Sequence, residues 1–203
     1  MKVTKAQAEA NRALVVETAS QLFRERGFDG VGVADLMAAA GFTHGGFYKQ
    51  FGSKADLMAE ASACGLAQTG ALAEGVDAAE FIRHYLSREH RDGRATGCTM
   101  AALSGDAARQ PDSVRAAFAQ GVENLLARLG QNGPASDPAA AAQLRARILD
   151  VLAHAMGAIV LSRACPDDSP LADEILAVCS EAILSAHTPP RDPQETSRKR
   201  KAG

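Results

Sequence analysis

The chain has 203 residues and a net charge of −2, and 46% of its residues are hydrophobic while only 4% are aromatic. This length allows a small module followed by a larger one, and the alanine-rich composition favours close-packed helices over strands. The opening residues lack the apolar segment of a secretory signal, and the apolar stretch at 151–161 is too short to span a bilayer. We therefore expect a cytoplasmic, all-α protein without a membrane segment.

Charge is distributed unevenly along the chain. Residues 1–58 carry a net charge of +1, residues 59–187 carry −6 and residues 188–203 carry +3. A slightly basic N-terminal unit ahead of an acidic body fits contact with DNA at one end and repulsion elsewhere.

The first predicted helix covers residues 10–26, where apolar side chains recur every three or four positions and form one buried face. Gly27 follows the charged last turn and is expected to end the helix in a left-handed cap, with Phe28 folding back onto it. A second, short helix is predicted over residues 33–40, and Gly41 breaks it.

A third, short helix is predicted over residues 44–50. Thr43 is placed to cap it, and Phe47 and Phe51, four residues apart, can fill the centre of a three-helix cluster. Gly45 and Gly46 lie inside this helix at a cost of about 1 kcal/mol each relative to alanine. Close approach of the backbone to a neighbouring helix or to a phosphate is one explanation for these glycines, and chance is another.

Ser53, with Asp56 three residues later, forms a variant capping box that starts a long helix leading into the body. Further helices are predicted at about 78–91, 100–109, 113–129, 138–163 and 170–187.

The last two predicted helices carry apolar residues on more than one face. Such helices need burial all round, within a large domain or against a second copy of the chain, and we prefer a homodimer formed through this pair. Residues 188–203 contain three prolines and a basic run, and are expected to form a disordered tail. In the predicted helix at 138–163, one apolar face consists of Leu144, Ile148, Leu152, Ala155 and Ile159, and a second consists of Leu149, Met156 and Val160.

Four cysteines, Cys64, Cys98, Cys165 and Cys179, stand far apart, with no C-x-x-C pair and no histidine pair to complete a zinc site. We therefore expect no metal and no cofactor. In a reducing cytosol the default interpretation of these cysteines is four small buried hydrophobic residues.

The helix, link, short helix, turn around Gly41 and second short helix together make a tri-helical helix-turn-helix, whose third helix enters the major groove of DNA. The segments FRERGF (23–28), VADLMAAAGFT (33–43) and GFYKQFGSKADL (46–57) resemble the N-terminal domain of the TetR/AcrR family of bacterial repressors. The resemblance covers about residues 10–58, and the ending F-Y-x-x-F-x-S-K-x-x-L is highly specific.

The resemblance implies a helix-turn-helix DNA-binding domain at 1–58 and an effector-binding and dimerisation domain at 59–187. It also implies a homodimeric repressor that places two recognition helices on a palindromic operator and is released by a small-molecule or electrophile effector. The positions that match DNA contacts of the family are Thr43, His44 and Gly45 near base edges and phosphates, Tyr48 and Lys49 at phosphates, Lys54 at the start of the fourth helix, and Arg12 in the first.

The residues themselves support part of this picture. Tyr48 and Lys49 lie beside the phenylalanine face of a short helix, so their side chains point outward, where they can meet phosphate oxygens. The alternative for Tyr48 is a core or rim aromatic, and the alternative for Lys54 is an ordinary solvated lysine at a helix start. The family usually opens the second helix with Thr or Ser, whereas Val33 stands here, and Gly46 replaces a side chain that can reach a base. Recognition is therefore expected to rely on backbone contacts and DNA shape.

Two features of the body are candidates for sensing. Cys98 precedes a helix, whose dipole would favour the thiolate and so an electrophile or oxidant sensor; a buried small residue is the alternative. Aromatic and apolar residues could line a ligand cavity with His154, for which a satisfied core histidine is the alternative. The candidate effector-binding or sensing residues are Phe81, Tyr85, Cys98, Met100, Phe118, His154 and Met156.

Other function classes have less support. No Ser-His-Asp order, metal cluster or phosphate-binding glycine loop indicates an enzyme, and we identify no catalytic residue. Nonspecific DNA binding or a scaffold role through the basic tail is a further alternative, which predicts steep salt dependence and no sequence preference.

Overall fold

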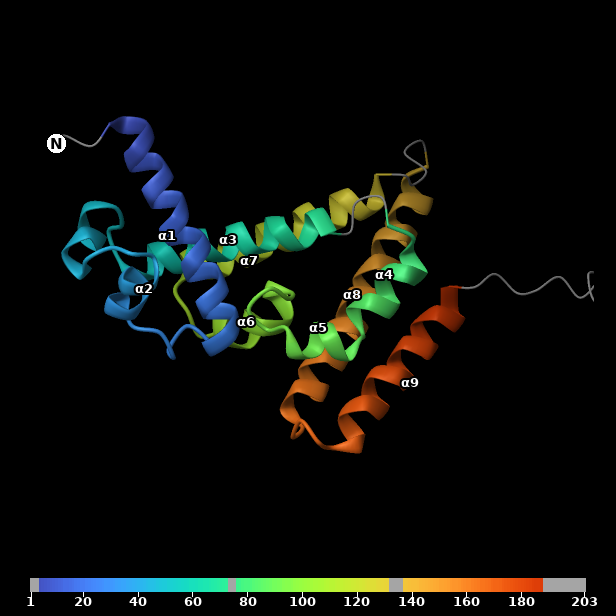
Figure 1. Ribbon diagram of the computed structural model, residues 1–203. Coiled ribbons are helices and arrows are strands. Elements are labelled where there is room, and N and C mark those ends of the chain that lie inside the picture. The colour runs from blue at the N-terminus through green and yellow to red at the C-terminus, as the bar shows by residue number, and fades with distance from the viewer. Residues whose placement is uncertain (1–3, 73–75, 132–136, 188–203) are drawn as a thin grey trace, which may run out of the picture.

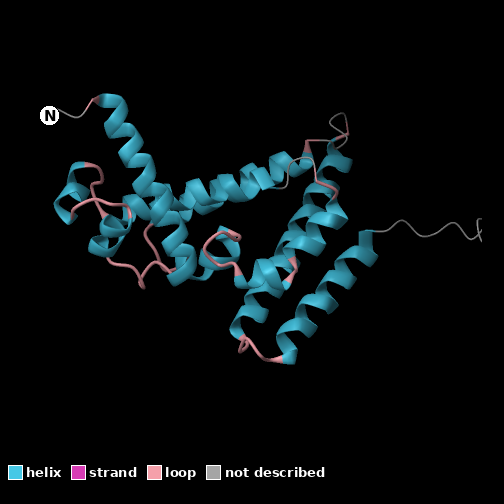
Figure 2. Ribbon diagram, viewed as in Figure 1, coloured by secondary structure: helices cyan, strands magenta, loops and turns pink. Residues whose placement is uncertain are grey.

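The structure, a computed structural model, describes residues 4–72, 76–131 and 137–187, and within these ranges it contains helices and no strand (Figure 2), which confirms the all-α class. In the same ranges no helix combines the length and apolarity needed to cross a membrane. The predicted basic tail at 188–203 lies outside the described residues. The helices are α1 (Lys5–Arg26), α2 (Val33–Ala39), the 3-10 helix η1 (His44–Lys49), α3 (Lys54–Leu72), α4 (Ala78–Tyr85), α5 (Arg88–Asp92), α6 (Thr99–Ala107), α7 (Asp112–Gly130), α8 (Pro138–Ala164) and α9 (Pro170–His187).

Figure 1 shows how these helices are arranged. The N-terminal helices α1 and α2 gather at one end of the molecule, and the long helices α3 and α7 lie against each other and run toward the other end. There α8 and α9 pack side by side, with α4 next to them. The elongated shape separates the N-terminal helices from the α8–α9 pair.

The N-terminal helices surround a shared aromatic centre. Phe47 and Phe51 stack with ring centroids 5.4 Å apart, and Phe23 and Phe28 meet edge to face at 5.2 Å. All four side chains are buried. Because this centre fixes which face of η1 points inward, it also fixes which face is left outside.

Both ends of α1 follow local rules. The helix begins earlier than predicted, since the Thr4 side chain caps it by accepting from the Gln7 N–H at 3.2 Å. It ends at Gly27 as predicted, with φ +75° and the Gly27 N–H bonded to the Phe23 carbonyl at 2.8 Å. Phe28 then folds back onto the helix, as the sequence indicates.

The third short helix differs from the prediction in two respects. It is a 3-10 helix, and the Thr43 side chain makes no capping hydrogen bond; instead the Thr43 carbonyl accepts from the Gly46 N–H at 2.9 Å. The two glycines weaken α-helical preference, and a six-residue segment is short enough for the tighter i to i+3 pattern. The predicted Ser53 cap is confirmed, because the Ser53 hydroxyl accepts from the Asp56 N–H at 3.1 Å, while the reciprocal bond to the Asp56 carboxylate is absent from the described residues.

The predicted helix at 78–91 is divided in two. Leu86 ends α4, and the Ser87 side chain caps α5 by accepting from the His90 N–H at 3.1 Å. A serine inside a helical pattern competes for backbone hydrogen bonds in this way, so it can end one helix and start another.

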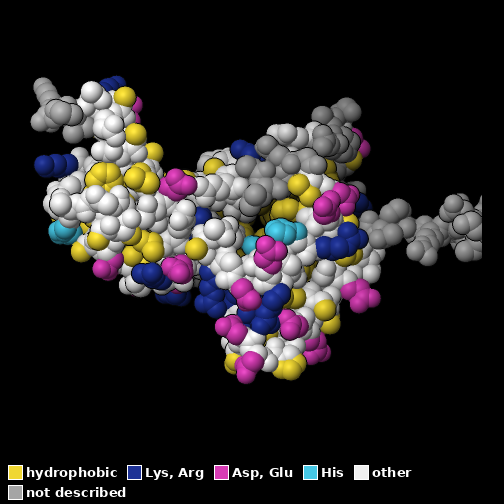
Figure 3. All heavy atoms as spheres, in the orientation of Figure 1, with side chains coloured by type: hydrophobic (Ala, Val, Ile, Leu, Met, Phe, Trp, Pro, Cys, Tyr) yellow, Lys and Arg dark blue, Asp and Glu magenta, His cyan; other side chains and the backbone are white. Residues whose placement is uncertain are grey.

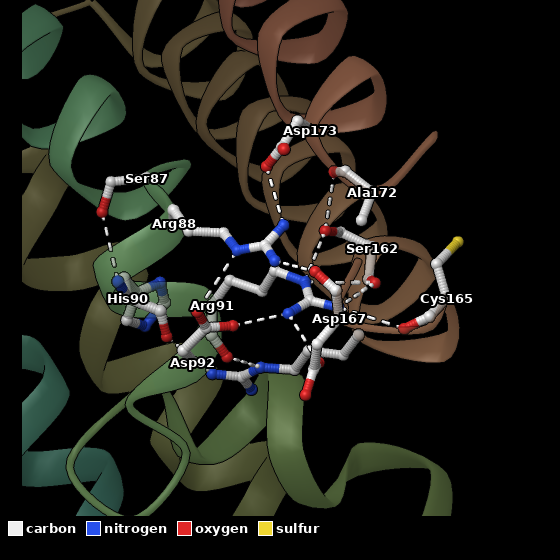
Figure 4. A network of polar contacts seen from close by, with 11 residues as sticks. Ser87, Arg88, His90, Arg91, Asp92, Ser162, Cys165, Asp167, Ala172 and Asp173 are labelled. Atoms are coloured by element: carbon white, nitrogen blue, oxygen red, sulfur yellow. Dashed lines mark hydrogen bonds and ion pairs between the residues drawn. The ribbon is translucent and has the colours of Figure 1, made fainter. Parts of the chain in front are cut away.

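A buried arginine fixes the turn between α8 and α9 (Figure 4). Arg91 is 1% exposed and donates to the Ser162 carbonyl at 3.0 Å and to the Cys165 carbonyl at 3.1 Å. It also pairs with Asp167 at 3.0 Å. The Ser162 hydroxyl in turn donates to the Ala172 carbonyl at 2.8 Å. These bonds join α5 to the end of α8 and to the turn, and they hold the start of α9 against α8.

Candidate nucleic-acid interface and ligand pocket

The outer face of η1 is exposed. Phe47 is fully buried, whereas Tyr48, on the next position, is 67% exposed. The Tyr48 ring meets the His44 ring edge to face, with centroids 5.9 Å apart. The η1 surface, as we call it, consists of five exposed residues that were all predicted as DNA contacts: Thr43, His44, Gly45, Tyr48 and Lys49.

Packing within the chain does not explain the glycines of η1. A Cβ atom added at Gly45 would meet nothing within 4 Å, and one added at Gly46 would make only ordinary contacts, at 3.5 Å with Met37 Cε and 3.9 Å with Thr43 Oγ1. Close approach to a neighbouring helix is therefore the wrong explanation. Close approach to an external group such as a phosphate, or chance, is consistent with this geometry.

Arg12, one of the predicted DNA contacts, is hydrogen-bonded to other residues of the same chain. Its two Nη atoms each lie 2.5 Å from a Glu60 carboxylate oxygen, its Nε donates to the Gln50 carbonyl at 3.4 Å, and its guanidinium lies 4.6 Å from the Phe51 ring centre. The hydrogen bonds to Glu60 raise the pKa of Arg12. This bidentate pair ties α1 to α3 and to the end of η1.

Lys54 is held in a similar way. Its Nζ donates to the Phe28 carbonyl at 2.6 Å and lies 6.0 Å from the Phe23 ring centre. This bond ties the first residue of α3 to the loop after α1, so a phosphate would have to compete with it. Lys49, by contrast, is exposed.

The body contains a cavity of about 330 Å³ between α3, α4, α6, α7 and α8, within the usual size range of small-molecule sites. Its walls are mostly apolar. Five of the seven residues predicted for effector binding line it: Phe81, Tyr85, Cys98, Met100 and Met156.

The other two predicted residues lie outside this cavity. His154 is exposed and Phe118 is buried elsewhere in the core, so neither lines the cavity. Successive helical residues are about 100° apart, which places His154 on the face of α8 opposite Met156. The apolar residues next to His154 in the sequence did not indicate which face of α8 its side chain occupies.

Several lining residues were not assigned to a cavity from the sequence. Leu144, Ile148 and Leu152 belong to a predicted apolar stripe, and their spacing already indicated one shared face. Arg147 lies on the same part of α8 and is the one charged lining residue among those described. It carries no hydrogen bond or ion pair within the described ranges, and no local sequence signal identified it.

The Tyr85 and Cys98 side chains place polar atoms in this apolar wall. Both are buried, and the Tyr85 hydroxyl makes no hydrogen bond to a nitrogen or oxygen of the described residues. Burial, and then the adjacent Cys98 thiol, raise the pKa of Tyr85 well above its ordinary value. His90 joins the two residues through the backbone, because its Nδ1 lies 2.6 Å from the Tyr85 carbonyl and its Nε2 accepts from the Cys98 N–H at 3.1 Å.

Cys98 is the N-cap residue of α6, at the helix start where it was predicted. Its side chain is 4% exposed and makes no capping bond. No group of three His, Cys, Asp or Glu side chains suited to a metal ion occurs among the described residues.

A short helix that is exposed on one face, anchored by buried phenylalanines and followed by a long helix into a helical body defines a helix-turn-helix DNA-binding regulator. Residues 15–61 match the family described as bacterial regulatory proteins, tetR family. This N-terminal segment is therefore similar to the DNA-binding domain of that family of transcriptional regulators.

Solved structures share the fold over most of the chain. Reduced NemR from E. coli is 19% identical, with a TM-score of 0.64 over 86% of this chain and 95% of that chain. A TetR-family regulator from Cytophaga hutchinsonii is 17% identical, with a TM-score of 0.67 over 91% and 98% of the two chains. One from Agrobacterium tumefaciens is 18% identical, with a TM-score of 0.63 over 90% and 100%. No curated protein sequence matches significantly.

Proposed function

We propose that this regulator is a repressor that binds a palindromic operator as a homodimer. It is released when a small molecule occupies the cavity between α3, α4, α6, α7 and α8. In this proposal residues 1–58 bind DNA, and residues 59–187 bind the effector and form the dimer. The observation that carries the proposal is the exposed η1 surface, whose side chains can reach DNA without disturbing the buried Phe47 beneath them.

On DNA, each side chain of the η1 surface has a chemical role. The Tyr48 hydroxyl and Lys49 ammonium bind phosphates, while Thr43 and His44 reach base edges at the start of the helix. Gly45 lets the backbone come close to the sugar-phosphate chain. Arg12 and Lys54, which are hydrogen-bonded within the protein, act mainly by positioning this surface.

The homodimer forms through the outer faces of α8 and α9. These faces expose large apolar side chains, an arrangement that favours association with another protein surface. In Figure 3 the end that contains α8 and α9 shows such side chains among charged ones. A two-fold dimer places two η1 surfaces symmetrically, as a palindromic operator requires. The exposed residues are Leu149, Val160, Leu161, Leu171 and Val178.

The effector acts by favouring one of two conformations, so its differential affinity for the DNA-free state supplies the energy of release. The cavity suits a reversibly bound small molecule. The Cys98 side chain is 4% exposed and lines the cavity. An electrophile that reacts with the Cys98 thiol would therefore have to enter this cavity.

Footprinting of the promoter next to the protein's own gene tests the proposal. We expect protection of a palindrome and loss of that protection when an effector is added. Absence of a protected palindrome, with or without candidate effectors, would contradict it. Turnover of a bound ligand would instead favour an enzyme, and salt-sensitive binding without sequence preference that disappears on deletion of residues 188–203 would favour a nonspecific DNA-binding protein.

A further inference from the structure

Tyr85 lines the cavity and carries a buried hydroxyl group without a strong hydrogen-bond partner among the described residues. Its side chain is 8% exposed, and its hydroxyl finds no nitrogen or oxygen partner among the described residues. The neighbouring Cys98 thiol is only a weak hydrogen-bonding group. Buried hydroxyl groups are rarely left in this state, because desolvation without a replacement bond is unfavourable. A bound molecule that carries a hydrogen-bond acceptor would supply the missing partner.

The rest of the cavity restricts what that molecule can be. Phe81 stacks on Tyr85, with ring centroids 5.7 Å apart and planes 28° from parallel, so these two lining residues form an aromatic part of the wall. Ile148, Leu152 and Met156 of α8 also line the cavity. A flat or ring-bearing apolar body fits such walls.

The charges on the wall argue for an uncharged ligand. Among the described lining residues there is no carboxylate to pair with a cation, and Arg147 is the one cation. The Arg147 side chain is exposed, so an anion bound by it would stay near solvent. Arg163, whose charge acts on Tyr85 and Cys98, lies outside the lining and donates to the His90 and Arg91 carbonyls. A carboxylate placed against Tyr85 and Cys98 would therefore be desolvated without a cation in the cavity wall to pair with, which is unfavourable.

We propose that Tyr85 is the polar anchor of the effector site, and that its ligand is an uncharged, mostly apolar molecule with one carbonyl-type acceptor bound to the Tyr85 hydroxyl. The inference rests on the proposed function, since it assigns a chemical class to the effector of the same cavity. It also assigns a specificity role to a residue at the C-terminal end of α4.

Benzophenone and diphenylmethane test this assignment, because they have the same two rings and differ by the carbonyl oxygen. Binding of each to the full chain is measured by equilibrium dialysis. We expect the wild type to bind benzophenone about five- to tenfold more tightly, the usual effect of one hydrogen bond. Tyr85→Phe should bring the two affinities within about twofold while leaving diphenylmethane binding unchanged, which also shows that the cavity is intact.

Tyr48→Phe is the matched control, since it makes the same chemical change at the only other tyrosine of the chain. It should bind both probes as the wild type does. The anion 4-benzoylbenzoate should bind more weakly than benzophenone. Persistence of the carbonyl preference in Tyr85→Phe, tighter binding of the anion, or failure of both neutral probes to bind would overturn the proposal.

Irradiation of the benzophenone complex locates the binding site of the probe, because the excited ketone inserts into C–H bonds that it touches. Labelled peptides from α4, α6 or α8 are expected, and labelling confined to other helices would overturn the site. Footprinting with the wild-type protein and with Tyr85→Phe separates the two proposals. A protected operator without probe binding refutes only this inference, whereas Tyr85-dependent binding without operator protection supports this inference and refutes only the repressor function.

Discussion

Arg24 and Ala95 are joined by a hydrogen bond of 2.7 Å from the guanidinium Nε of the first to the carbonyl oxygen of the second. Arg24 lies on α1 and is 6% exposed, and its Nη1 also donates to the Ser20 hydroxyl at 2.9 Å and to the Thr99 hydroxyl at 3.3 Å. Thr99 follows Cys98 of the cavity wall. The contact therefore lies between the proposed effector site and the DNA-binding end of the chain.

Replacement of Arg24 with methionine should lower the free energy of unfolding by about 2 kcal/mol, because it leaves the Ala95 carbonyl without its donor. It should also raise the effector concentration needed to release DNA, while effector binding itself persists. Urea unfolding and effector titration of a footprint measure the two effects. Arg26→Met is the control and should change stability by less than about 0.5 kcal/mol, because Arg26 is exposed and forms a surface ion pair with its neighbour Glu25. Normal stability and normal release in Arg24→Met would refute the coupling role.

Lys49 and Lys54 should behave differently when each is replaced by methionine. Lys49→Met should weaken DNA binding and reduce the slope of log K against log salt concentration by about 1, with little change in stability. Lys54→Met should lower stability by about 1 to 2 kcal/mol, because the Phe28 carbonyl loses its donor, and should leave the salt slope unchanged. DNA titrations over a range of salt concentrations and denaturant unfolding separate the two. A reduced salt slope in Lys54→Met would mean that Lys54 contacts phosphate directly.

Val160 offers a test of the dimer surface. Its side chain is 48% exposed on α8, and burial of a valine against a partner contributes about 1.5 to 3 kcal/mol. Val160→Glu should therefore raise the dimer dissociation constant about tenfold or more. Leu14→Glu is the control, since Leu14 is also 48% exposed but lies on α1. Sedimentation over a concentration series measures both, and a Val160→Glu protein that dimerises like the wild type would exclude this part of α8 from the interface.

His90 makes the stability of the body depend on pH. Burial lowers its pKa from the ordinary value of 6.5, Arg163 and His84 act in the same direction, and the bond to the Tyr85 carbonyl opposes them. Its Nε2 accepts from the Cys98 N–H, so a protonated ring would face that donor with another N–H. The unfolded chain therefore binds the proton more readily, and stability should fall as the pH drops below about 6.5, down to the lowered pKa of the folded state.

Replacement of His90 with glutamine should flatten this part of the stability profile, since glutamine has no proton to gain. His44→Gln, at an exposed residue of η1, should keep the wild-type slope. Thermal unfolding between pH 5 and 8 compares the variants over the range in which histidine titrates. An unchanged slope in His90→Gln would assign the pH dependence to other groups.

Features set by neighbours in sequence were predictable. The stop of α1 at Gly27, the Ser53 cap of α3 and the pairing of Phe47 with Phe51 all depend on residues within one or two helical turns, where capping rules and helical periodicity apply. The same local patterns predicted that the Tyr48 side chain points outward and that α8 has an apolar face. They also carried the family resemblance, since the helix-turn-helix is a continuous segment.

The tertiary structure decided how distant residues meet and how each helix is rotated. Lys54 finds the Phe28 carbonyl, and Arg91 finds the α8–α9 turn, across separations of 26 and 71 to 76 residues along the chain. Helical periodicity groups the residues of α8 into faces but does not say which face meets α4. In the structure Met156 lines the cavity, whereas His154 is exposed on another face. A hydrogen bond or a cavity wall needs atoms placed within a fraction of an ångström in three dimensions, and only the packing of all the helices together sets those positions.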